Sequence, residues 1–487
     1  MSKKPSQNMA VHNETLIYLF PLVFRAILSL VVLIPLTTFF LDAEDFGLFA
    51  LITVLVLPIQ ALGSSSSRWV IGGNTFKGMT EDNYRELIFN LLLFEFLVRS
   101  LIVLVYFLMG QQILALAFGE VSDLYLSFFH LALLASLLGS IWPTVSYLMI
   151  VQKKAIVYAI FLVVQLCING LVSAIGLWHL GWGVEALFIA LVSANLVSLV
   201  FELWFIKDQV RPKPSMTSVR NITGYFLRSI PGGTIEITNG LFERILISQH
   251  VSLAGLGIYS HSQQYLGIMK SATQAFSNVL TPRTLQVYSE EADARELSAL
   301  LYFWFAFLCV LGIGMVFFAD EFIAMLTHGK FTDAAPLLIL WVFFTLSSSF
   351  GIPYAQYLIA FKRTNLLMYT QVIPSLVGIV TLWPAIVTYG YYGAAVTMLS
   401  VSLVTQFSRR WAALHSGMVA INDKMFLASL AILIIIWALD WFLKPTFSNE
   451  ILFFLSASFI YLWIIGIWSR IKNYIAGHAN KDSSSVS

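Results

Sequence analysis

Long apolar segments follow one another along this chain with little sequence between them. A helix of about twenty apolar residues is long enough to cross the hydrocarbon of a bilayer. Fourteen segments of that kind are present, with ends uncertain by several residues: 15–40, 46–70, 87–109, 124–149, 155–177, 183–206, 224–249, 254–282, 299–319, 333–360, 365–388, 391–414, 425–443 and 450–470. The sequence therefore predicts an all-α polytopic membrane protein, and the short connections leave no room for a soluble domain.

Composition agrees with a membrane location. Hydrophobic residues make up 58% of the 487 residues and charged residues only 11%, whereas a soluble domain is nearer a quarter charged. The N-terminal stretch begins with basic residues but has no short apolar core with a cleavage site. It reads as a tail that leads into the first span and not as a signal peptide.

The distribution of Lys and Arg predicts the topology, because cytoplasmic loops carry an excess of both. With the N-terminus placed in the cytoplasm, the predicted outside loops hold only Lys330 and Lys444 of the 28 basic residues. Four more fall within spans: Arg25, Arg99, Arg244 and Lys270. All the others lie in inside segments, so both termini are expected in the cytoplasm. The net charge of +2 gives no indication of nucleic-acid binding.

The chain also repeats itself at a fixed offset of 210 residues. Pro21 aligns with Pro231, Gly47 with Gly257, and the stretch "PTVSYL" (143–148) with "PYAQYL" (353–358). We infer two six-helix lobes at 1–206 and 222–414, joined by a cytoplasmic linker at 207–221. Helices 13 and 14 (425–470) and a cytoplasmic tail (471–487) follow. Six helices return the chain to the side it started from, so the lobes are parallel and related by a pseudo-two-fold along the membrane normal. That symmetry is typical of carriers that work by alternating access.

Charged residues within the spans are candidate functional residues, since a charge at the bilayer centre costs about 2.5–3.5 kcal/mol on insertion scales. Glu95 and Arg99 are four residues apart on one helix and can neutralise each other. Neither Arg25 nor Lys270 has a carboxylate within a turn along the chain. Both lie roughly 15–18 Å from the cytoplasmic face, at 1.5 Å per residue. They favour a shared anion site, with a distant carboxylate partner or snorkelling towards the interface as the alternatives.

The seventh span carries a glutamate and an arginine side by side, in "GLFERILISQH" (240–250). Glu236 precedes Glu243 by seven residues and lies on nearly the same face, whereas Arg244 points about 100° away from Glu243. One of the two carboxylates is a candidate for carrying a proton or a sodium ion. The alternative is that Glu243 and Arg244 tie the helix to different neighbours. Arg68, at the inner mouth of the second span, is either a topological anchor or a contact for a headgroup.

No arrangement of residues points to catalysis, a metal or a cofactor. The eight histidines are scattered, and no nucleophile–base pair or phosphate loop is present. Cys167 and Cys309 are interpreted as apolar residues of the helix interfaces. The sequence predicts a protein that is not an enzyme.

Four stretches resemble a known family of bacterial polysaccharide flippases, the Wzx type. They are "LDAEDFGLFALI" (41–52), "GLFERILISQHVSLAGLGIYSHSQQYLGIM" (240–269), "FKRTNLLMYTQV" (361–372) and "YGYYGAAVTMLSVSL" (389–403). The family has an acidic–Arg pair, usually Asp-Arg, where this chain has Glu243–Arg244. The resemblance covers essentially the whole chain.

The resemblance implies membership of the multidrug/oligosaccharidyl-lipid/polysaccharide exporter superfamily. Such proteins move an undecaprenyl-pyrophosphate-linked oligosaccharide, an intermediate of lipopolysaccharide or exopolysaccharide synthesis, to the periplasmic leaflet of the bacterial inner membrane. The cavity is expected between helices 1, 2, 7 and 8, where Arg25, Arg68, Arg244 and Lys270 are found. A monomer in the bilayer is expected, with contacts to a polysaccharide polymerase and a chain-length regulator.

Three other functions make different demands on the sequence. A drug or cation antiporter of the same superfamily would have an acidic cavity, and the in-span cations Arg25 and Lys270 argue against it. A membrane polysaccharide polymerase would carry a large periplasmic loop with arginines, whereas the longest predicted outside loop, 319–333, holds only Lys330. A passive structural subunit has no need of the repeat.

Overall fold

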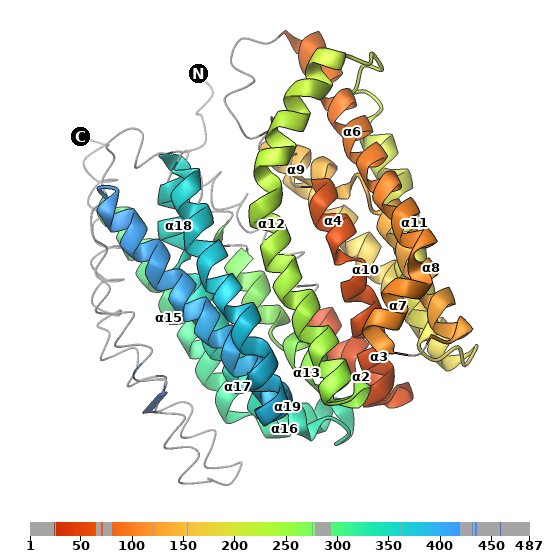
Figure 1. Cartoon of the computed structure of the whole chain (residues 1–487), viewed down its shortest axis with the longest axis vertical. Coiled ribbons are helices and arrows are strands. Elements are labelled where there is room, and N and C mark those ends of the chain that lie inside the picture. Colours follow the sequence, from red (N-terminus) through yellow and green to blue (C-terminus); the bar gives the residue numbers. More distant parts are fainter. Residues whose placement is uncertain are drawn as a thin grey trace, which may run out of the picture. The chain divides into compact units, whose positions relative to one another are not determined.

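The structure is a computed structural model of the 487-residue chain. It describes residues 24, 26–64, 70–71, 80–119, 121–152, 154–274, 276–277, 294–361, 363–418, 431, 434–435 and 458. Every regular element among these residues is a helix (Figure 1). The chain divides into two compact units by its internal contacts. The first comprises Met1–His261, Leu326–Lys330 and Ser375–Ala394, and the second comprises Ser262–Met325, Phe331–Pro374 and Ala395–Ser487.

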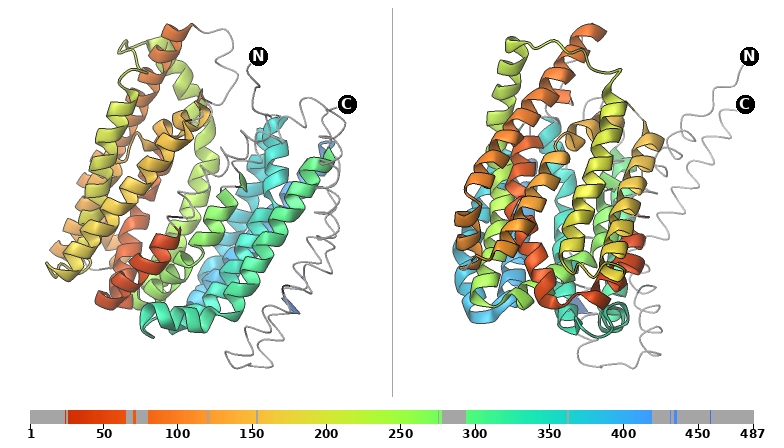
Figure 2. Two further views of the ribbon diagram at one scale, coloured as in Figure 1. Left: turned by 180° about the vertical axis from the view of Figure 1, so that it is seen from behind. Right: turned by 90° about the vertical axis from the view of Figure 1, so that its right-hand side faces the viewer.

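The first unit contains most of the described helices, and its bundle of long helices is seen from two further sides in Figure 2. A π-helical turn η1(Ser29–Leu33) leads into the first regular helix. The helices are α2(Ile34–Phe40), α3(Ala43–Leu55), α4(Leu57–Ser64), α6(Glu81–Leu108), α7(Gly110–Phe118), α8(Asp123–Leu138), α9(Trp142–Val151), α10(Ala155–Trp178), α11(Glu185–Ile206), α12(Met216–His250) and the first part of α13(Leu253–Gln264).

Helix starts in this unit follow from capping side chains. Thr80 accepts from the amide of Asn83 at the start of α6, Ser122 caps α8 and Ser215 caps α12. These hydroxyls satisfy amides that the first helical turn leaves without a partner. The Ser215 cap makes the seventh predicted helix begin at Met216 and not near 224, because the polar residues 216–223 continue the helix beyond the apolar run.

The second unit is also helical in its described residues. It contains α15(Ala294–Phe317), a 3₁₀ turn η3(Thr332–Ala334), α17(Ala335–Phe350), α18(Ile352–Ala360), most of α16(Ala319–Thr327) and both ends of α19(Thr364–His415). Proline occupies the first turn of α17 and of α18, where its missing N–H costs nothing. α19 is two helices in one element, because Gly390 breaks it with φ 60° and ψ −144°. That break lies between the predicted spans 365–388 and 391–414.

The protein is a multi-span membrane protein. Seven described helices or helix pairs are long and apolar enough to cross a bilayer, and a pair bent by 68°, Trp304–Phe317 with Ala319–Thr327, raises the number to eight. Large apolar side chains are exposed along their outer faces, among them Leu101, Ile160 and Val380, which suits contact with lipid tails. The predicted count of fourteen stays a prediction, since the spans 425–443 and 450–470 lie outside the described residues apart from four positions.

Helix boundaries recur at the offset that the sequence predicts. α7 begins at Gly110 and α16 at Ala319, α9 begins at Trp142 and α18 at Ile352, and α10 begins at Ala155 and α19 at Thr364. Each pair is separated by 209 or 210 positions. The two copies therefore begin these helices at nearly equivalent positions, although the lobe boundaries 1–206 and 222–414 stay a prediction.

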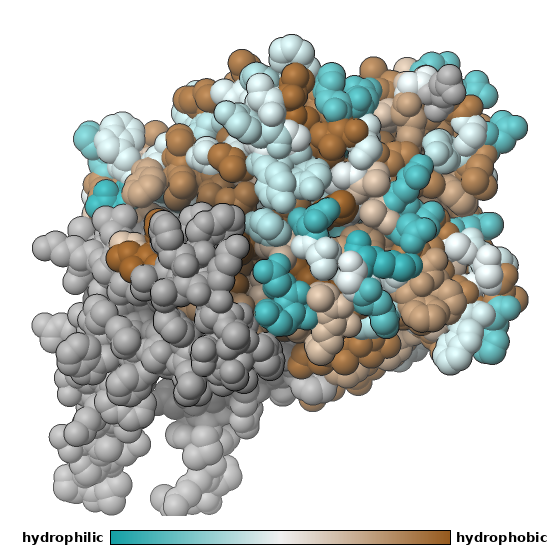
Figure 3. Space-filling model, turned by 90° about the horizontal axis from the view of Figure 1, so that it is seen from below, coloured by the Kyte–Doolittle hydropathy of each residue, from teal (hydrophilic) through white to brown (hydrophobic). Residues whose placement is uncertain are grey.

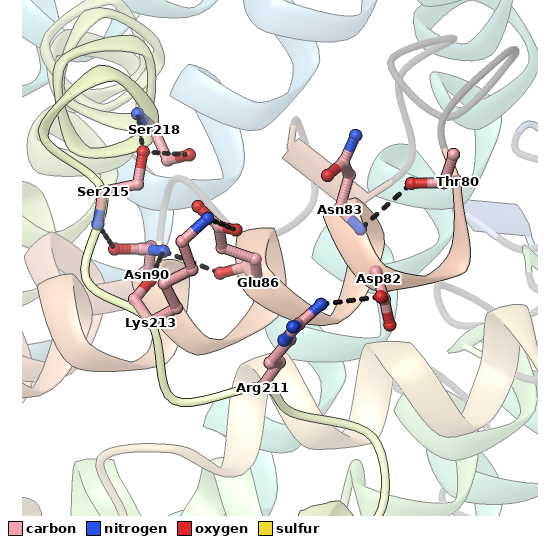
Figure 4. A network of polar contacts seen from close by, with 9 residues as sticks. All are labelled: Thr80, Asp82, Asn83, Glu86, Asn90, Arg211, Lys213, Ser215 and Ser218. Atoms are coloured by element: carbon pink, nitrogen blue, oxygen red, sulfur yellow. Dashed lines mark hydrogen bonds and ion pairs between the residues drawn. The ribbon is translucent and has the colours of Figure 1, made fainter.

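The linker after α11 is fastened to the beginning of α6 (Figure 4). Asn90, fully buried, donates to the carbonyl of Lys213 (3.0 Å) and accepts from the amide of Ser215 (2.8 Å). Arg211 pairs with Asp82 at 2.6 Å, and Lys213 pairs with Glu86 at 3.2 Å. Arg211 and Asp82 are both exposed, and Lys213 is exposed although Glu86 is not. The side chain of Asn90 is fully buried, so we expect its hydrogen bonds to contribute more to stability than the exposed Arg211–Asp82 pair.

Replacing Asn90 with Leu is therefore expected to lower stability by about 1–3 kcal/mol, because a buried donor and acceptor of the linker lose their partner. Arg211→Ala is expected to cost at most about 1 kcal/mol, as exposed ion pairs do. The midpoint of thermal unfolding in detergent measures both variants. A larger loss in Arg211→Ala than in Asn90→Leu would contradict the assignment.

Candidate functional site

α12 carries the charged pair Glu243 and Arg244, and it is surrounded by other helices of the first unit. It packs against α3, α4, α6 and α7, and Figure 1 shows it alongside α4 and α6. Glu243 is 5% exposed, Arg244 is half-buried, and Asn239, one turn before Glu243, is buried. α12 thus places polar groups on its inward side in the middle of an otherwise apolar segment.

The remaining predicted site residues are placed as follows. Arg25 and Arg68 lie outside the described residues, and Glu236 lies on α12 with its side chain outside the description. Lys270 belongs to the second unit, where its side chain is exposed and its amide donates to the carbonyl of Leu266. The anion site proposed for Arg25 and Lys270 therefore stays a prediction. Glu243 and Arg244 are the two residues whose surroundings are described within one unit.

Beyond Glu243, α12 runs seven more residues to His250, roughly 10 Å at 1.5 Å per residue. That end of α12 is remote from the linker that precedes the helix, and it is called the distal end below. Figure 3 looks at the molecule from below the view of Figure 1, where hydrophilic and hydrophobic residues both reach the surface. A mixed face of that kind is expected where spanning helices meet the headgroup region.

Two glycines bring α3 and α13 into backbone contact at the distal end. A Cβ added to Gly47 would lie 1.9 Å from the carbonyl oxygen of Leu253, and one added to Gly257 would lie 1.7 Å from that of Ala43. Neither position has room for any side chain. Small residues allow membrane helices to approach this closely.

The residues on the two sides of this contact are equivalent to each other in the 210-residue repeat. Gly47 corresponds to Gly257 at the offset of 210, and Ala43 corresponds to Leu253. The contact of Gly47 with Leu253 and the contact of Gly257 with Ala43 are thus the same contact made twice. A self-complementary contact of this type is what a two-fold axis between two related elements generates.

Hydrogen bonds beside the glycines repeat the same relation. The hydroxyl of Thr38 lies 3.2 Å from the carbonyl oxygen of Leu326, and the hydroxyl of Ser248 lies 3.4 Å from that of Ala117. Each hydroxyl has a shorter contact, 2.8 Å, with a carbonyl of its own helix. Thr38 and Ser248 are equivalent at the offset of 210, and the two accepting carbonyls differ from equivalence by one residue. Polar contacts between helices of the two predicted lobes thus recur at the distal end.

Two further contacts reinforce this end. The side-chain amide of Gln249 donates a hydrogen bond to the carbonyl of Leu116 at 2.6 Å. Lys330 donates to the carbonyl of Phe39 (3.3 Å) and pairs with Asp42 (3.2 Å). We call this set of contacts, centred on Gly47 and Gly257 and flanked by Thr38, Ser248 and Lys330, the distal closure.

Sequence reasoning missed some of these residues. The offset revealed Gly47 and Gly257 as a pair but gave no indication that they touch. Thr38 and Ser248 are ordinary hydroxyl residues in apolar runs, and only their equivalence at the offset of 210 could have drawn attention to them. The pairing of Glu95 with Arg99 was incomplete, because a third charged group, Glu202, acts on the same guanidinium.

Comparisons with known proteins agree with this architecture. The sequence profile of a family described as "Polysaccharide biosynthesis protein" matches residues 38–336. No curated protein sequence matches the chain. Among solved structures, "Lipid II flippase MurJ, inward closed conformation" resembles the chain with a TM-score of 0.70 at 13% identity, covering 94% of this chain and 98% of that one.

Two multidrug transporters resemble it as well. The inward-facing conformation of a multidrug resistance MATE family transporter of the MOP superfamily gives a TM-score of 0.61 at 13% identity, covering 82% of this chain and 94% of that one. A mutant of the Vibrio cholerae MATE transporter VcmN gives a TM-score of 0.59 at 13% identity, covering 85% of this chain and 98% of that one. These solved structures are of flippases and transporters, not of enzymes.

The chain therefore has the fold of these flippase and transporter structures, in agreement with the predicted resemblance. The chain belongs to the polysaccharide biosynthesis protein family whose profile it matches over more than half its length.

The distal closure predicts a selective effect of a single methyl group. Gly47→Ala should force α3 and α13 apart and raise the rate at which a cysteine at Ser248 reacts with a membrane-impermeant maleimide. Gly240→Ala is the matched control, because a Cβ at Gly240 meets nothing within 4 Å. Equal labelling rates in Gly47→Ala, Gly240→Ala and the parent protein would show that the contact does not seal this end.

Proposed function

We propose that the protein is a flippase for undecaprenyl-pyrophosphate-linked oligosaccharide repeat units. It carries the sugar–pyrophosphate headgroup from the cytoplasmic to the periplasmic leaflet while the polyprenyl tail stays in lipid. The distal closure is the observation that carries this proposal. It brings equivalent helices of the two predicted lobes into close contact at their distal ends, which suits a protein that opens to one side at a time.

Two features support this class of substrate: the family to which the chain belongs and the cations within its spans. The family profile concerns polysaccharide biosynthesis, and one solved relative in fold is a lipid II flippase. A pyrophosphate carries two negative charges or more, and Arg offers it a bidentate fork whereas Lys offers a point charge. Arg25, Arg68, Arg244 and Lys270 are the cations proposed to receive it.

The proposed cycle has four steps. The inward-open state accepts the headgroup at Arg25 and Lys270, with Arg68 at the inner mouth. The halves then rock, and the distal closure separates. The headgroup leaves past Arg244, which lies about 9 Å inside the distal end by the rise of the helix. Loading and release of an ion at Glu236 or Glu243 returns the transporter to its starting state.

An orientation and a location in the membrane accompany this function. Both termini face the cytoplasm, because Lys and Arg concentrate in the loops on that side. The distal closure then faces the periplasm, and the protein resides in the bacterial inner membrane as a monomer. A polymerase and a chain-length regulator of polysaccharide synthesis are the partners that would take over the product.

Charge reversal tests the anion site. Arg25→Glu and Lys270→Glu are expected to reduce transport roughly thirtyfold or more, because losing one partner of a desolvated charge pair costs about 2–5 kcal/mol. Arg25→Lys and Lys270→Arg should be milder, and alanine should be intermediate. Restoration of surface polysaccharide in a strain that lacks the protein measures activity, with membrane protein levels determined in parallel.

Arg85→Glu serves as the control for charge reversal. Arg85 is an exposed residue that pairs with Glu81 within α6 at 2.6 Å, so its reversal should leave export unchanged. Full export by Arg25→Glu at normal protein levels would remove the anion site from the proposal. If both reversals leave polysaccharide export intact but change export of a cationic drug, a drug exporter is favoured instead.

The coupling role of α12 is tested separately. Glu243→Gln or Glu236→Gln should abolish the response of transport to pH or sodium while binding of the headgroup survives, since an amide keeps the shape of the carboxyl group but cannot be charged. Transport measured in proteoliposomes with imposed proton and sodium gradients distinguishes the two ions. If both variants disappear from the membrane, the carboxylates are structural ties of the helix and not coupling groups.

A further inference from the structure

A second group of charges lies within the first unit, apart from α12. Glu95 and Arg99 lie on α6 and Glu202 lies on α11, with exposed fractions of 1%, 0% and 0%. The hydroxyl of Thr144, on α9, donates a short hydrogen bond to Glu95. Three helices thus bring three charged side chains and a hydroxyl together in a region from which solvent is excluded.

The charged groups of this cluster differ in how many hydrogen bonds they make. Arg99 donates to the carbonyls of Gly139 (3.2 Å) and Gln60 (3.3 Å). Its charge attracts both Glu95 and Glu202. Neither carboxylate oxygen of Glu202 accepts a hydrogen bond from the described residues. Glu95 is therefore held by a hydroxyl, while Glu202 faces the cluster with no described donor at either oxygen.

The charges in the cluster do not balance. With both carboxylates ionised, two negative charges face one guanidinium, and a net charge of minus one remains buried. An uncompensated charge in an apolar interior is expensive, and such a group neutralises itself in preference to staying charged. One proton added to a carboxylate oxygen of Glu202 brings the cluster to neutrality and supplies an O–H, and no other bond has to form or break.

The second copy of the repeat shows that the fold does not need these charges. At the offset of 210, Glu95 corresponds to Phe305, Arg99 to Cys309 and Glu202 to Ala412. Cys309 and Ala412 are buried in the second unit, and Thr144 corresponds to the buried Tyr354. The positions equivalent to the cluster thus carry no charged side chain in the second copy. Buried ion pairs are often no more stabilising than apolar residues of similar volume, so stability does not explain the charged version.

We propose that the Glu95–Arg99–Glu202 cluster is a proton-binding site of the first lobe, with Glu202 as the group that takes up and releases one proton. Glu202 lies four residues before the end of α11, roughly 6 Å from the linker side by the rise of the helix. A proton from the water on the linker side therefore has only this short distance to cover to reach Glu202. Uptake neutralises the cluster, and release restores the attraction between Glu202 and Arg99.

Other charged and titratable groups lie on the helices around Glu202. Tyr147 and Tyr158 come from α9 and α10, and Lys154 lies over the ring of Phe205 at 4.8 Å. Arg99 is the charge that acts on Glu202. The remaining groups lie toward the distal half of α8 or on an exposed face of α10: Asp123, Tyr125, His130 and Cys167.

Binding of the proton stands independently of the transported substrate. The further step, that occupancy of the cluster drives the transport cycle, rests on the proposed flippase function. It deepens that function by naming the proton as a coupling ion and by adding a candidate coupling site on helices other than α12. Sodium is the competing ion, and it is distinguished by the test below.

Infrared difference spectra of the purified protein between alkaline and acid pH, recorded without substrate, test the binding step. The C=O stretch of a protonated carboxyl group should appear on acidification in the wild type. It should be lost in Glu202→Gln and kept in Glu185→Gln, a control at the other end of α11. Glu202→Asp, which retains a carboxyl group, should keep the band at a shifted frequency if Glu202→Gln fails to fold.

Absence of the band in the wild type, its persistence in folded Glu202→Gln, or its removal by sodium at constant pH would overturn the proton site. The coupling step is then tested in proteoliposomes, where Glu202→Gln should lose the acceleration that a proton gradient produces. If flipping of the lipid-linked substrate is absent while the infrared band is present, the proposed function fails and the proton site stands. The opposite result, flipping without the band, defeats the proton site alone.

Discussion

Hydrocarbon offers no hydrogen-bonding partner to a backbone amide or a polar side chain, and this restriction shapes the whole chain. Helices satisfy their backbones internally, which leaves side-chain polar groups to find partners within the protein. Thr37 and Thr38 return their hydroxyls to carbonyls one turn earlier. Arg99 donates to two carbonyls of other segments. Such polar side chains inside the spans thus bond to backbone carbonyls, either of their own helix or of another segment.

The same solvent weakens the usual driving force between helices, since a lipid tail is as apolar as a leucine side chain. Close approach of backbones becomes the alternative source of attraction. Gly47 and Gly257 provide it at the distal closure, where the hydroxyls of Thr38 and Ser248 also come near backbone carbonyls of the facing helices.

Two kinds of buried charge follow from the symmetry of the chain. Glu243 and Arg244 lie on α12, about two turns inside a closure that is built from equivalent residues of both copies. The Glu95–Arg99–Glu202 cluster lies in one copy and is replaced by uncharged residues in the other. A substrate that passes along the axis needs groups near the symmetric contact, whereas a coupling ion needs a site in only one half. We therefore propose proton binding at the second group, in addition to the roles proposed for Glu243 and Arg244.

The sequence alone determined the class of fold. Apolar runs of membrane-spanning length, one-sided Lys and Arg, and glycines and prolines at a constant offset are local or periodic signals, and they predicted the helices, the break near Gly390 and the repeat. It also identified Glu243 and Arg244, because a charge in an apolar run is conspicuous without any structure. It placed the start of α12 too late, because polar residues continue a helix that hydropathy alone would end.

Only the tertiary structure decided which of these residues meet. Glu202 is 103 positions from Arg99 in the sequence, and nothing along the chain indicates that α11 brings it to α6. The contact between Gly47 and Gly257 likewise depends on how two helices cross, which is set by side chains from several elements at once. Periodicity shows which face of a helix is apolar, but the partner of that face is fixed only when the whole bundle assembles.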